Sequence, residues 1–466
     1  MCGHLLDFLF NVKSVAVIGA SHDPMKIGHA IMENVLGTGF SGKIYPINPA
    51  NKEIMGLRCY MNVTEVKDSI DLVVIALPAR RSVEALNQCV AAKVKCVIIV
   101  AGGFSELGEE GRALQDQINE MIKGKQTRVI GPNTVGVLFP YSNLNTALTP
   151  KERIYYPGRG DIAFISQSGA LGLLTMDSIT EYDLGISGFV NIGNRADIDE
   201  SDLMQAFSED IHTKSIAVYL ESVSDGNKFY ETVKRVNLKK PVVVLKTGRS
   251  EASSRAASFH TGALASDDRV IDGILKQAGV QRALDEVELI DYGKALAYGK
   301  PLKGKRIAII TTAGGAGVVT TDLLTSNEYG PALDLTRFND TETAEMKKAV
   351  LPFASVANPI DLTADGSVET YEILLDVISK SGNVDGIIAY ALPQTPKIDL
   401  GIVDVLSKYA RNKPMVIGVI GNRLAKDVLR ELEKKRIPAY PSISRSVKAM
   451  KVLYNYGHFL DRRGTP

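Results

Sequence analysis

The chain has 466 residues, of which 45% are hydrophobic, with 54 basic and 53 acidic side chains. At roughly 150 residues per domain, this length predicts about three domains, each able to bury a core. The formal net charge of +1 provides no excess field to attract nucleic acid or an anionic membrane, so we expect neither as a partner.

The cysteines and the N-terminus favour a reducing, cytoplasmic compartment. All 4 cysteines precede Val97, none has CxxC spacing, and they are too few for a disulfide scaffold or a Cys-rich zinc module. The stretch from Met1 to Lys13 is interrupted by Asp7 and Asn11 and has neither a basic start nor a cleavage signal. We therefore expect a cytoplasmic protein without a targeting or membrane-spanning segment.

Short Val- and Ile-rich runs alternate with helix-length amphipathic segments, a pattern typical of parallel sheets covered by helices. The fold class predicted is therefore α/β throughout. In a first domain, residues 1–140, we expect strands at Ser14–Ile18, Lys43–Ile47, Leu72–Ala76, Cys96–Val100 and Arg128–Ile130. The stretch Tyr141–Gly160 has little periodicity and several Asn, Thr, Pro and Gly residues, and we interpret it as a linker.

A second domain, residues 141–299, and a third, 300–466, are predicted on the same grounds. The second has expected strands at Asp161–Ile165, Gly188–Val190, Ser215–Leu220 and Pro241–Lys246, with helix at Leu203–Phe207 and Val270–Ala278. The third follows the basic joint Lys300–Lys305, with expected strands at Arg306–Thr311, Gly386–Tyr390 and Met415–Val419. The segments DIAFISQSGALG and RIAIITTAGGAG repeat one strand–turn–helix pattern, so we interpret the two domains as related modules.

The first glycine-containing turn, from Gly19 to Gly28, joins a strand to a helix whose N-terminal amides can receive phosphate. This favours a nucleotide-like ligand. The turn does not spell GxGxxG, and the second strand ends at Asn48 where a nicotinamide-binding domain usually offers an acid, so an NAD-dependent oxidoreductase is disfavoured. Lys26 and Lys52 could meet the phosphates of an ADP-like group, although isolated surface lysines are usually only solvated.

Two later turns have the composition of anion sites. Ser166-Gln167-Ser168-Gly169 and Thr312–Gly317 each follow a strand and open a helix, so their backbone N–H groups can face one anion. For a single turn, a glycine needed only for backbone conformation or close packing is the commoner explanation. Because two matching turns occur in successive domains, we favour the interpretation that they hold a phosphoryl group without a metal.

His260 differs from the other histidines because it lies in a long stretch of small and polar residues, Gly248–Ala265. Since neutral imidazole is nucleophilic near pH 7, His260 is a candidate for accepting and carrying a phosphoryl group; a hydrogen-bonding histidine is the alternative. Glu221 ends a buried-looking strand, where open α/β sheets bind ligands, and could orient the imidazole or simply be a surface acid. No histidine has metal-ligand spacing, so we expect no metal site.

Taken together, these residues resemble the nucleoside-diphosphate-forming acyl-CoA synthetases, and within them the α-subunit type of the ADP-forming acetate–CoA ligases. The resemblance covers nearly the whole chain and rests on the order of its motifs: Gly19-Ala20-Ser21 with Pro24, Lys26 and Gly28, then Tyr45–Pro49, Ile130–Asn133, Ser166–Gly169, Glu221 and Ser258–Ala263. Singly each motif is weak; together they are specific.

The resemblance implies a Rossmann-like CoA-binding domain followed by two flavodoxin-like domains of the succinyl-CoA-ligase type. It implies CoA binding by Gly19, Ala20, Ser21, Lys26, Gly28, Asn48, Lys52, Val100 and Ala101. It also implies phosphate binding by Ser166, Ser168, Gly169, Gly314, Gly315 and Gly317, with Glu221 orienting His260. Acyl-CoA, phosphate and ADP would yield carboxylate, CoA and ATP through an acyl phosphate and a phosphohistidine.

The sequence departs from the family pattern in two places. No ATP-grasp segment follows the third domain, so the resemblance implies a separate ATP-grasp β subunit, an α2β2 assembly, and Mg²⁺ with ADP or ATP on that partner. Relatives specific for succinate continue the serine motif to a Tyr at the position of Leu173, which favours a small monocarboxylate such as acetate here. Succinate, branched or aryl acids remain alternatives, as does a CoA-binding regulatory module.

Overall fold

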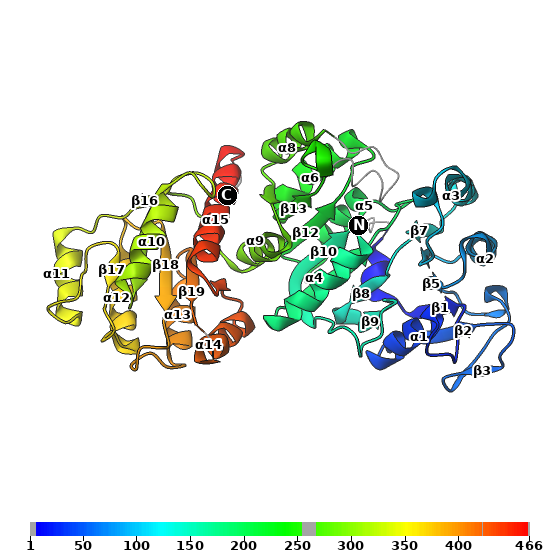
Figure 1. The fold of residues 1–466 in the computed structure, drawn as a ribbon, viewed down its shortest axis with the longest axis horizontal. Helices are drawn as coiled ribbons and strands as arrows, with labels where there is room; N and C mark the ends of the chain where they lie inside the picture. Colours follow the sequence, from blue (N-terminus) through cyan, green and yellow to red (C-terminus); the bar gives the residue numbers. More distant parts are fainter. Residues whose placement is uncertain (1–5, 254–266, 422, 465–466) are drawn as a thin grey trace. The chain divides into compact units, whose positions relative to one another are not determined.

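The structure is a computed structural model that describes residues 6–253, 267–421 and 423–464. The chain divides into two compact units, Met1–Ala278 and Gly279–Pro466. Figure 1 shows parallel strands flanked by helices in each unit, which confirms the predicted α/β class.

The first sheet of unit 1 has the strand order β2-β1-β5-β6-β7, and all its neighbouring strands run parallel. Its strands are β1 (Ser14–Ile18), β2 (Lys43–Ile47), β5 (Leu72–Ile75), β6 (Cys96–Ile99) and β7 (Arg128–Ile130), with helices α1 (Ile27–Gly37), α2 (Ala79–Ala91) and α3 (Glu109–Ile122). A small hairpin, β3 (Glu53–Ile54) with β4 (Leu57–Arg58), follows β2. The order reverses between β1 and β5, and open α/β sheets typically bind ligands at the carboxyl ends of such a strand pair.

The second sheet of unit 1 contains the parallel strands β13-β12-β10-β11, extended by the antiparallel strands β8 and β9. These are β8 (Val137–Phe139), β9 (Leu144–Asn145), β10 (Arg159–Ser166), β11 (Ile186–Asn191), β12 (Ser215–Leu220) and β13 (Val242–Lys246), with helices α4 (Gly169–Glu181), α5 (Glu200–Glu209), α6 (Gly226–Lys239) and α8 (Asp268–Gln277). Here the order reverses between β10 and β12. The turns after these two strands therefore meet at one edge.

The stretch Tyr141–Gly160 is not the predicted linker, because residues near both of its ends belong to this second sheet. Leu144 and Asn145 form β9, which pairs with β8, and both residues are almost fully buried. The amide of Asn34 on α1 donates to the carbonyls of Ala147 and Thr149, at 2.8 Å each. Within the stretch, the Thr146 hydroxyl accepts the Val137 N–H at 3.0 Å and the Asn145 side chain accepts the Ala147 N–H at 2.9 Å, so polar residues that indicated a linker bond buried backbone instead.

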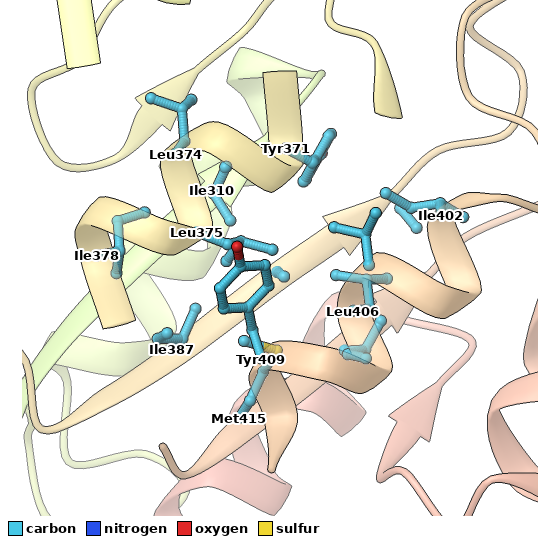
Figure 2. Packing of buried hydrophobic residues seen from close by; sticks show 14 of the residues in the cluster. Ile310, Tyr371, Leu374, Leu375, Ile378, Ile387, Ile402, Leu406, Tyr409 and Met415 are labelled. Carbon is cyan, nitrogen blue, oxygen red and sulfur yellow. The ribbon is translucent and has the colours of Figure 1, made fainter. Parts of the chain in front are cut away.

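Unit 2 is built around a third sheet, β16-β15-β18-β19-β20, with β17 pairing with β15. Its elements are β14 (Gln281–Ala283), α9 (Glu286–Tyr298), β15 (Arg306–Thr311), α10 (Gly314–Thr325), β16 (Asp334–Leu335), α11 (Asp340–Ala349), β17 (Ile360–Asp361), α12 (Val368–Lys380), β18 (Gly386–Ala391), α13 (Ile402–Ala410), β19 (Met415–Val419), α14 (Arg423–Lys434), β20 (Ala439–Tyr440) and α15 (Ile443–Arg462). Alternate strand residues such as Ile310 and Ile387 pack against Leu374, Leu375 and Leu406 of α12 and α13 (Figure 2).

The predicted internal repeat is visible in matching local contacts. The Ser166 hydroxyl at the end of β10 donates to the Ser168 carbonyl at 2.7 Å, and the Thr311 hydroxyl at the end of β15 donates to the Ala313 carbonyl at 3.2 Å. One helical turn farther on, Thr175 and Thr320 each bond the carbonyl four residues earlier. The β10–α4 unit of the second sheet and the β15–α10 unit of the third therefore share one strand–turn–helix pattern.

A buried ion pair within unit 2 allows a stability prediction. Lys294 Nζ lies 2.5 Å from Glu433 Oε1 and 2.6 Å from the Ala439 carbonyl, and both charged side chains are less than 5% exposed. Removing the cation leaves a buried carboxylate without its countercharge, so Lys294→Met should destabilise the protein by about 3–5 kcal/mol. Differential scanning calorimetry would show this as a lower transition temperature, whereas the control Lys408→Met, at an exposed pair with Glu372, should leave it almost unchanged.

The same variant should show a distinctive pH dependence. Burial raises the pKa of Glu433 and the charge of Lys294 opposes that rise, so the pKa should rise further in Lys294→Met. A raised folded-state pKa gives stability that is present below the ordinary glutamate pKa of about 4.3 and is lost as pH rises through the raised value. The transition temperature of Lys294→Met should therefore lie closer to the parent's at pH 5 than at pH 8; an equal deficit at both would contradict this assignment.

Candidate active site

The first turn lies where the order of the first sheet reverses. Gly19 has a φ of +90°, and a Cβ there would lie 2.5 Å from the Ala76 carbonyl oxygen at the end of β5. A Cβ on Gly28, in the first turn of α1, would lie 2.0 Å from the Gly19 carbonyl oxygen. Glycine is thus required at both positions, and the two together bring the start of α1 directly against the end of β1.

The other predicted CoA residues of this turn differ in exposure. Ala20 and Ser21 are buried, and the Ser21 hydroxyl accepts the Asp23 N–H at 3.0 Å. Asn48 is half-buried and donates to the Ala20 carbonyl at 2.8 Å, so it holds the turn itself. Lys26, the residue before α1, and Lys52, before β3, are exposed. Both ammonium groups are therefore open to solvent, and their contact with an anion stays a prediction.

A cavity of about 540 Å³ in unit 1 is lined by four of the remaining candidates. Val100, after β6, lines it together with Ser168 and Gly169 at the start of α4 and Glu221 after β12. Because β10 and β12 are neighbours, with Ser166 opposite Tyr219, the turns that follow them open onto the same space. The cavity is also lined by Asn133, of the Ile130–Asn133 motif, and by residues that the sequence did not single out: Glu106, Asn194, Arg195 and Ser222.

The start of α4 is the turn predicted to bind phosphate in unit 1. Ser168 is the N-cap residue, and its hydroxyl oxygen accepts the Leu171 N–H at 3.4 Å. Its hydroxyl proton and the first amides of α4 are therefore available to an anion in the cavity. Ser166 is buried and does not line the cavity, since its hydroxyl donates to the Ser168 carbonyl.

Glu221 lies on a short turn between β12 and α6, next to Tyr219. The Tyr219 hydroxyl donates to Glu221 Oε1 at 3.4 Å and also contacts the Thr247 hydroxyl at 3.2 Å. Burial is the main cause of the raised pKa of Tyr219, and the nearby Glu221 carboxylate adds to it. The tyrosine therefore remains a neutral donor that helps to hold the carboxylate in the cavity wall.

Glu106 connects the two sheets of unit 1 across this cavity. It accepts the Gly103 N–H at 2.5 Å and the Asn194 side-chain amide, also at 2.5 Å. Burial raises its pKa, but these hydrogen bonds and that from Phe104 outweigh burial and make the net shift a lowering. Glu106 is thus an ionised carboxylate occupied by donors, which suits holding the Gly102–Phe104 turn against Asn194 rather than proton transfer.

The predicted phosphate turn of unit 2 has packing reasons for two of its glycines. A Cβ on Gly314 would lie 2.5 Å from Asp361 Oδ2, and one on Gly317 would lie 3.0 Å from Cβ of Pro359. Gly315 is exposed, and a Cβ on it would meet no atom within 4 Å. Ala313, the N-cap residue of α10, makes no side-chain cap bond, unlike Ser168. The convergence of this turn with Ser168 on one anion stays a prediction.

His260 lies outside the described residues, so its predicted partnership with Glu221 stays a prediction. Among the residues that are described, no group of three or more His, Cys, Asp or Glu side chains is arranged to hold a metal ion. In the same part of the chain, every helix is too short or too polar to cross a bilayer. Cys59, Cys89 and Cys96 are free thiols, and burial raises the pKa of Cys89 to about 12.

Three family models match consecutive parts of the chain. Residues 13–140 match a CoA binding domain, 159–296 a succinyl-CoA ligase like flavodoxin domain, and 307–458 a Ligase-CoA domain. This order confirms the predicted fold of a Rossmann-like CoA-binding domain followed by succinyl-CoA-ligase-type domains. These three domains together define the class of acyl-CoA ligases.

Relatives make the family more specific. The chain is 38% identical to the α subunit of the ADP-forming acetate–CoA ligase I of Pyrococcus furiosus, covering 97% of both chains. It is 36% identical to the ADP-forming acetate–CoA ligase of Methanocaldococcus jannaschii, covering 97% of this chain but 63% of that protein. A solved structure of the dinucleotide-forming acetyl-coenzyme A synthetase 1 of Candidatus Korarchaeum cryptofilum, in complex with phosphate and ADP, superposes with a TM-score of 0.90 at 36% identity, covering 99% of both chains.

The chain belongs to the ADP-forming acetate–CoA ligase family, as its motifs indicated. It corresponds to the part that forms a whole α subunit in Pyrococcus furiosus, a designation that implies a partner subunit in that enzyme.

Proposed function

We propose that the chain is the α subunit of an ADP-forming acyl-CoA synthetase that acts on acetyl-CoA. The complete enzyme converts acetyl-CoA, phosphate and ADP into acetate, CoA and ATP. The observation that carries the proposal is the cavity of unit 1, which combines the N-terminus of α4 and the Glu221 carboxylate with Val100 from the CoA-binding sheet. An anion site, an orienting acid and the expected end of CoA thus border one space.

The proposed reaction proceeds in three transfers. A phosphate oxygen attacks the thioester carbonyl carbon, the C–S bond breaks, and CoA leaves as a thiolate that takes up a proton. Nε2 of His260 then attacks the phosphorus of the acyl phosphate, and acetate leaves as the carboxylate. Finally, an oxygen of the ADP β-phosphate attacks the phosphohistidine phosphorus and releases the imidazole. Both intermediates retain much of the free energy of the thioester.

Within this reaction, Glu221 accepts a hydrogen bond from Nδ1–H of His260, which leaves Nε2 as the nucleophile. Ser168 and Gly169 at the start of α4 bind the phosphate oxygens, and the exposed Gly315 at the start of α10 does so at the corresponding turn of unit 2. Gly19 and Gly28 bring the helix α1 amides to the phosphates of CoA, with Lys26 and Lys52 at the edge.

The ADP-binding step belongs to a separate ATP-grasp β subunit in an α2β2 assembly, with Mg²⁺ accompanying the nucleotide on that subunit. A cytoplasmic location is consistent with the free thiols of Cys59, Cys89 and Cys96.

The proposal is tested by ATP formation in the complex of this chain with its partner subunit, supplied with acetyl-CoA, phosphate and ADP. We expect ATP synthesis that requires both subunits and all three substrates. Succinyl-CoA should react at about 1% or less of the acetyl-CoA kcat/KM, because Leu173 offers no hydrogen bond to a second carboxylate. A complex that binds CoA but forms no ATP would favour the regulatory alternative, and equal use of succinyl-CoA would refute the specificity.

The CoA assignment can be tested at Gly28. Because a Cβ there would overlap the Gly19 carbonyl oxygen, Gly28→Ala should displace the first turn and weaken CoA binding about 10-fold or more. Isothermal titration calorimetry measures the effect. Gly37→Ala at the end of the same helix is the matched control, since its Cβ would meet only Lys151 Nζ at 3.6 Å, and it should bind CoA like the parent. Equal affinities in both variants would place CoA elsewhere.

A further inference from the structure

The Glu221–Ser222 turn is held on one side by Gln167, a residue of the α4 turn. Gln167 Oε1 accepts the N–H groups of Glu221 at 2.5 Å and of Ser222 at 3.1 Å. Its Nε2 donates to the Ser222 carbonyl at 2.9 Å. Gln167 is only 8% exposed, so water does not readily replace these bonds. One amide side chain thereby fixes three backbone groups of the turn that carries Glu221.

Arg195, after β11, holds the same turn from a second direction. Its guanidinium donates to the Ser222 carbonyl at 2.9 Å and to the Ser222 hydroxyl at 2.7 Å. It is itself held by Glu200 on α5, at 3.2 Å, and the Glu200 side chain is only 2% exposed. Burial raises the pKa of Glu200 while the charge of Arg195 opposes the rise. These contacts fix the orientation of the planar Arg195 guanidinium group. A lysine ammonium group could not reproduce its hydrogen bonds to both the carbonyl and the hydroxyl of Ser222.

These bonds set the position of Glu221 relative to the anion site. Gln167 lies between Ser166 and Ser168, so the residue that fixes the Glu221 turn is part of the turn that opens α4. Asn191 bonds the carbonyls of Ser166 and Gln167 at 2.8 and 3.2 Å and ties that turn to β11. A shift of about 1 Å between reacting groups can cost about 100-fold in rate.

We propose that Gln167 and Arg195 are positioning residues that act on the reaction through Glu221. This inference rests on the proposed role of Glu221 as the acid that orients His260. Neither side chain is required to touch the substrate; each holds the Glu221–Ser222 backbone at a fixed distance from the N-terminus of α4.

The test is single-turnover phosphorylation of His260 from acetyl-CoA and phosphate in the complex with the partner subunit, for Gln167→Met, Glu221→Gln and the double variant. Gln167→Met should slow phosphorylation about 10- to 100-fold and leave the KM for acetyl-CoA within about 2-fold. In the double variant, Gln167→Met should slow the reaction by less than about 3-fold beyond Glu221→Gln alone, since both changes disable the same group. Gln205→Met, which removes an amide that contacts Arg235 on the surface, is the matched control and should retain the parental rate.

Arg195→Lys provides a second variant should Gln167→Met fail to fold. Arg195→Lys keeps a positive charge beside Glu200 but loses the planar guanidinium group, and should slow phosphorylation about 10-fold. Combined with Glu221→Gln, it should add little further slowing, as expected for Gln167→Met. If the double variants were slowed by the full product of the single effects, the positioning roles of Gln167 and Arg195 would be refuted and the role of Glu221 would stand. The same conclusion would follow if Gln167→Met and Arg195→Lys kept the parental rate while Glu221→Gln was slow. An unchanged rate in Glu221→Gln would instead refute the proposed role of Glu221, and this inference with it.

Discussion

His260→Ala is expected to abolish ATP formation from acetyl-CoA, phosphate and ADP, with a loss of about 1,000-fold or more. The reason is chemical: the variant lacks the imidazole proposed to take the phosphoryl group from the acyl phosphate and pass it to ADP. CoA affinity should stay within about 3-fold of the parent's, because the proposed CoA turn at Gly19 and Gly28 belongs to the first sheet. Steady-state assays of the complex and calorimetric titration with CoA measure the two effects.

His212→Ala is the matched control for this variant. His212 stacks on Tyr141 with the ring centroids 3.6 Å apart, and it does not line the cavity that contains Glu221. Turnover should therefore stay within about 2-fold of the parent's. Substantial turnover in His260→Ala would refute the phosphohistidine mechanism.

Glu221→Gln should slow phosphorylation of His260 about 100-fold in a single turnover and leave CoA binding nearly unchanged. The amide keeps the size of the carboxylate and can still accept from Tyr219, but it loses the negative charge that stabilises a positively charged imidazole. Rapid-quench measurement of the phosphorylated chain separates this step from CoA binding.

Glu209→Gln is the control, since Glu209 forms a surface pair with Lys239, and its phosphorylation rate should match the parent's. If Glu221→Gln were phosphorylated as fast as the parent, Glu221 would be a structural acid of the β12–α6 turn.

Strands with a strong local signal were predicted closely. β1, β2, β7, β12, β15 and β19 have the predicted ends, because each is a mostly buried run bounded by polar or turn residues. Strands of two residues, such as β9, β16 and β20, were not predicted. A run that short has no period of its own, and its pairing depends on the neighbour that the rest of the fold supplies.

The site shows the same division between local and nonlocal information. Glu221 was found because a carboxylate directly after a buried strand lies at the edge where parallel sheets bind ligands, and the structure places it in one cavity with Ser168. Arg195 and Asn194 follow β11 in the same way, but their partners Ser222 and Glu106 lie 27 and 88 residues away. The order of the strands in the second sheet brings the first pair together, and the second pair joins the two sheets of unit 1, so composition alone gave no signal for either.

The most direct test of the phosphohistidine mechanism is mass spectrometry of the complex with its partner subunit, after exposure to acetyl-CoA and phosphate, under alkaline conditions that preserve phosphohistidine. We expect phosphate on the peptide that contains His260, and its loss when ADP is added together with formation of ATP. A complex that turns over acetyl-CoA, phosphate and ADP while this peptide stays unmodified, in the presence and absence of ADP, would contradict the proposed reaction.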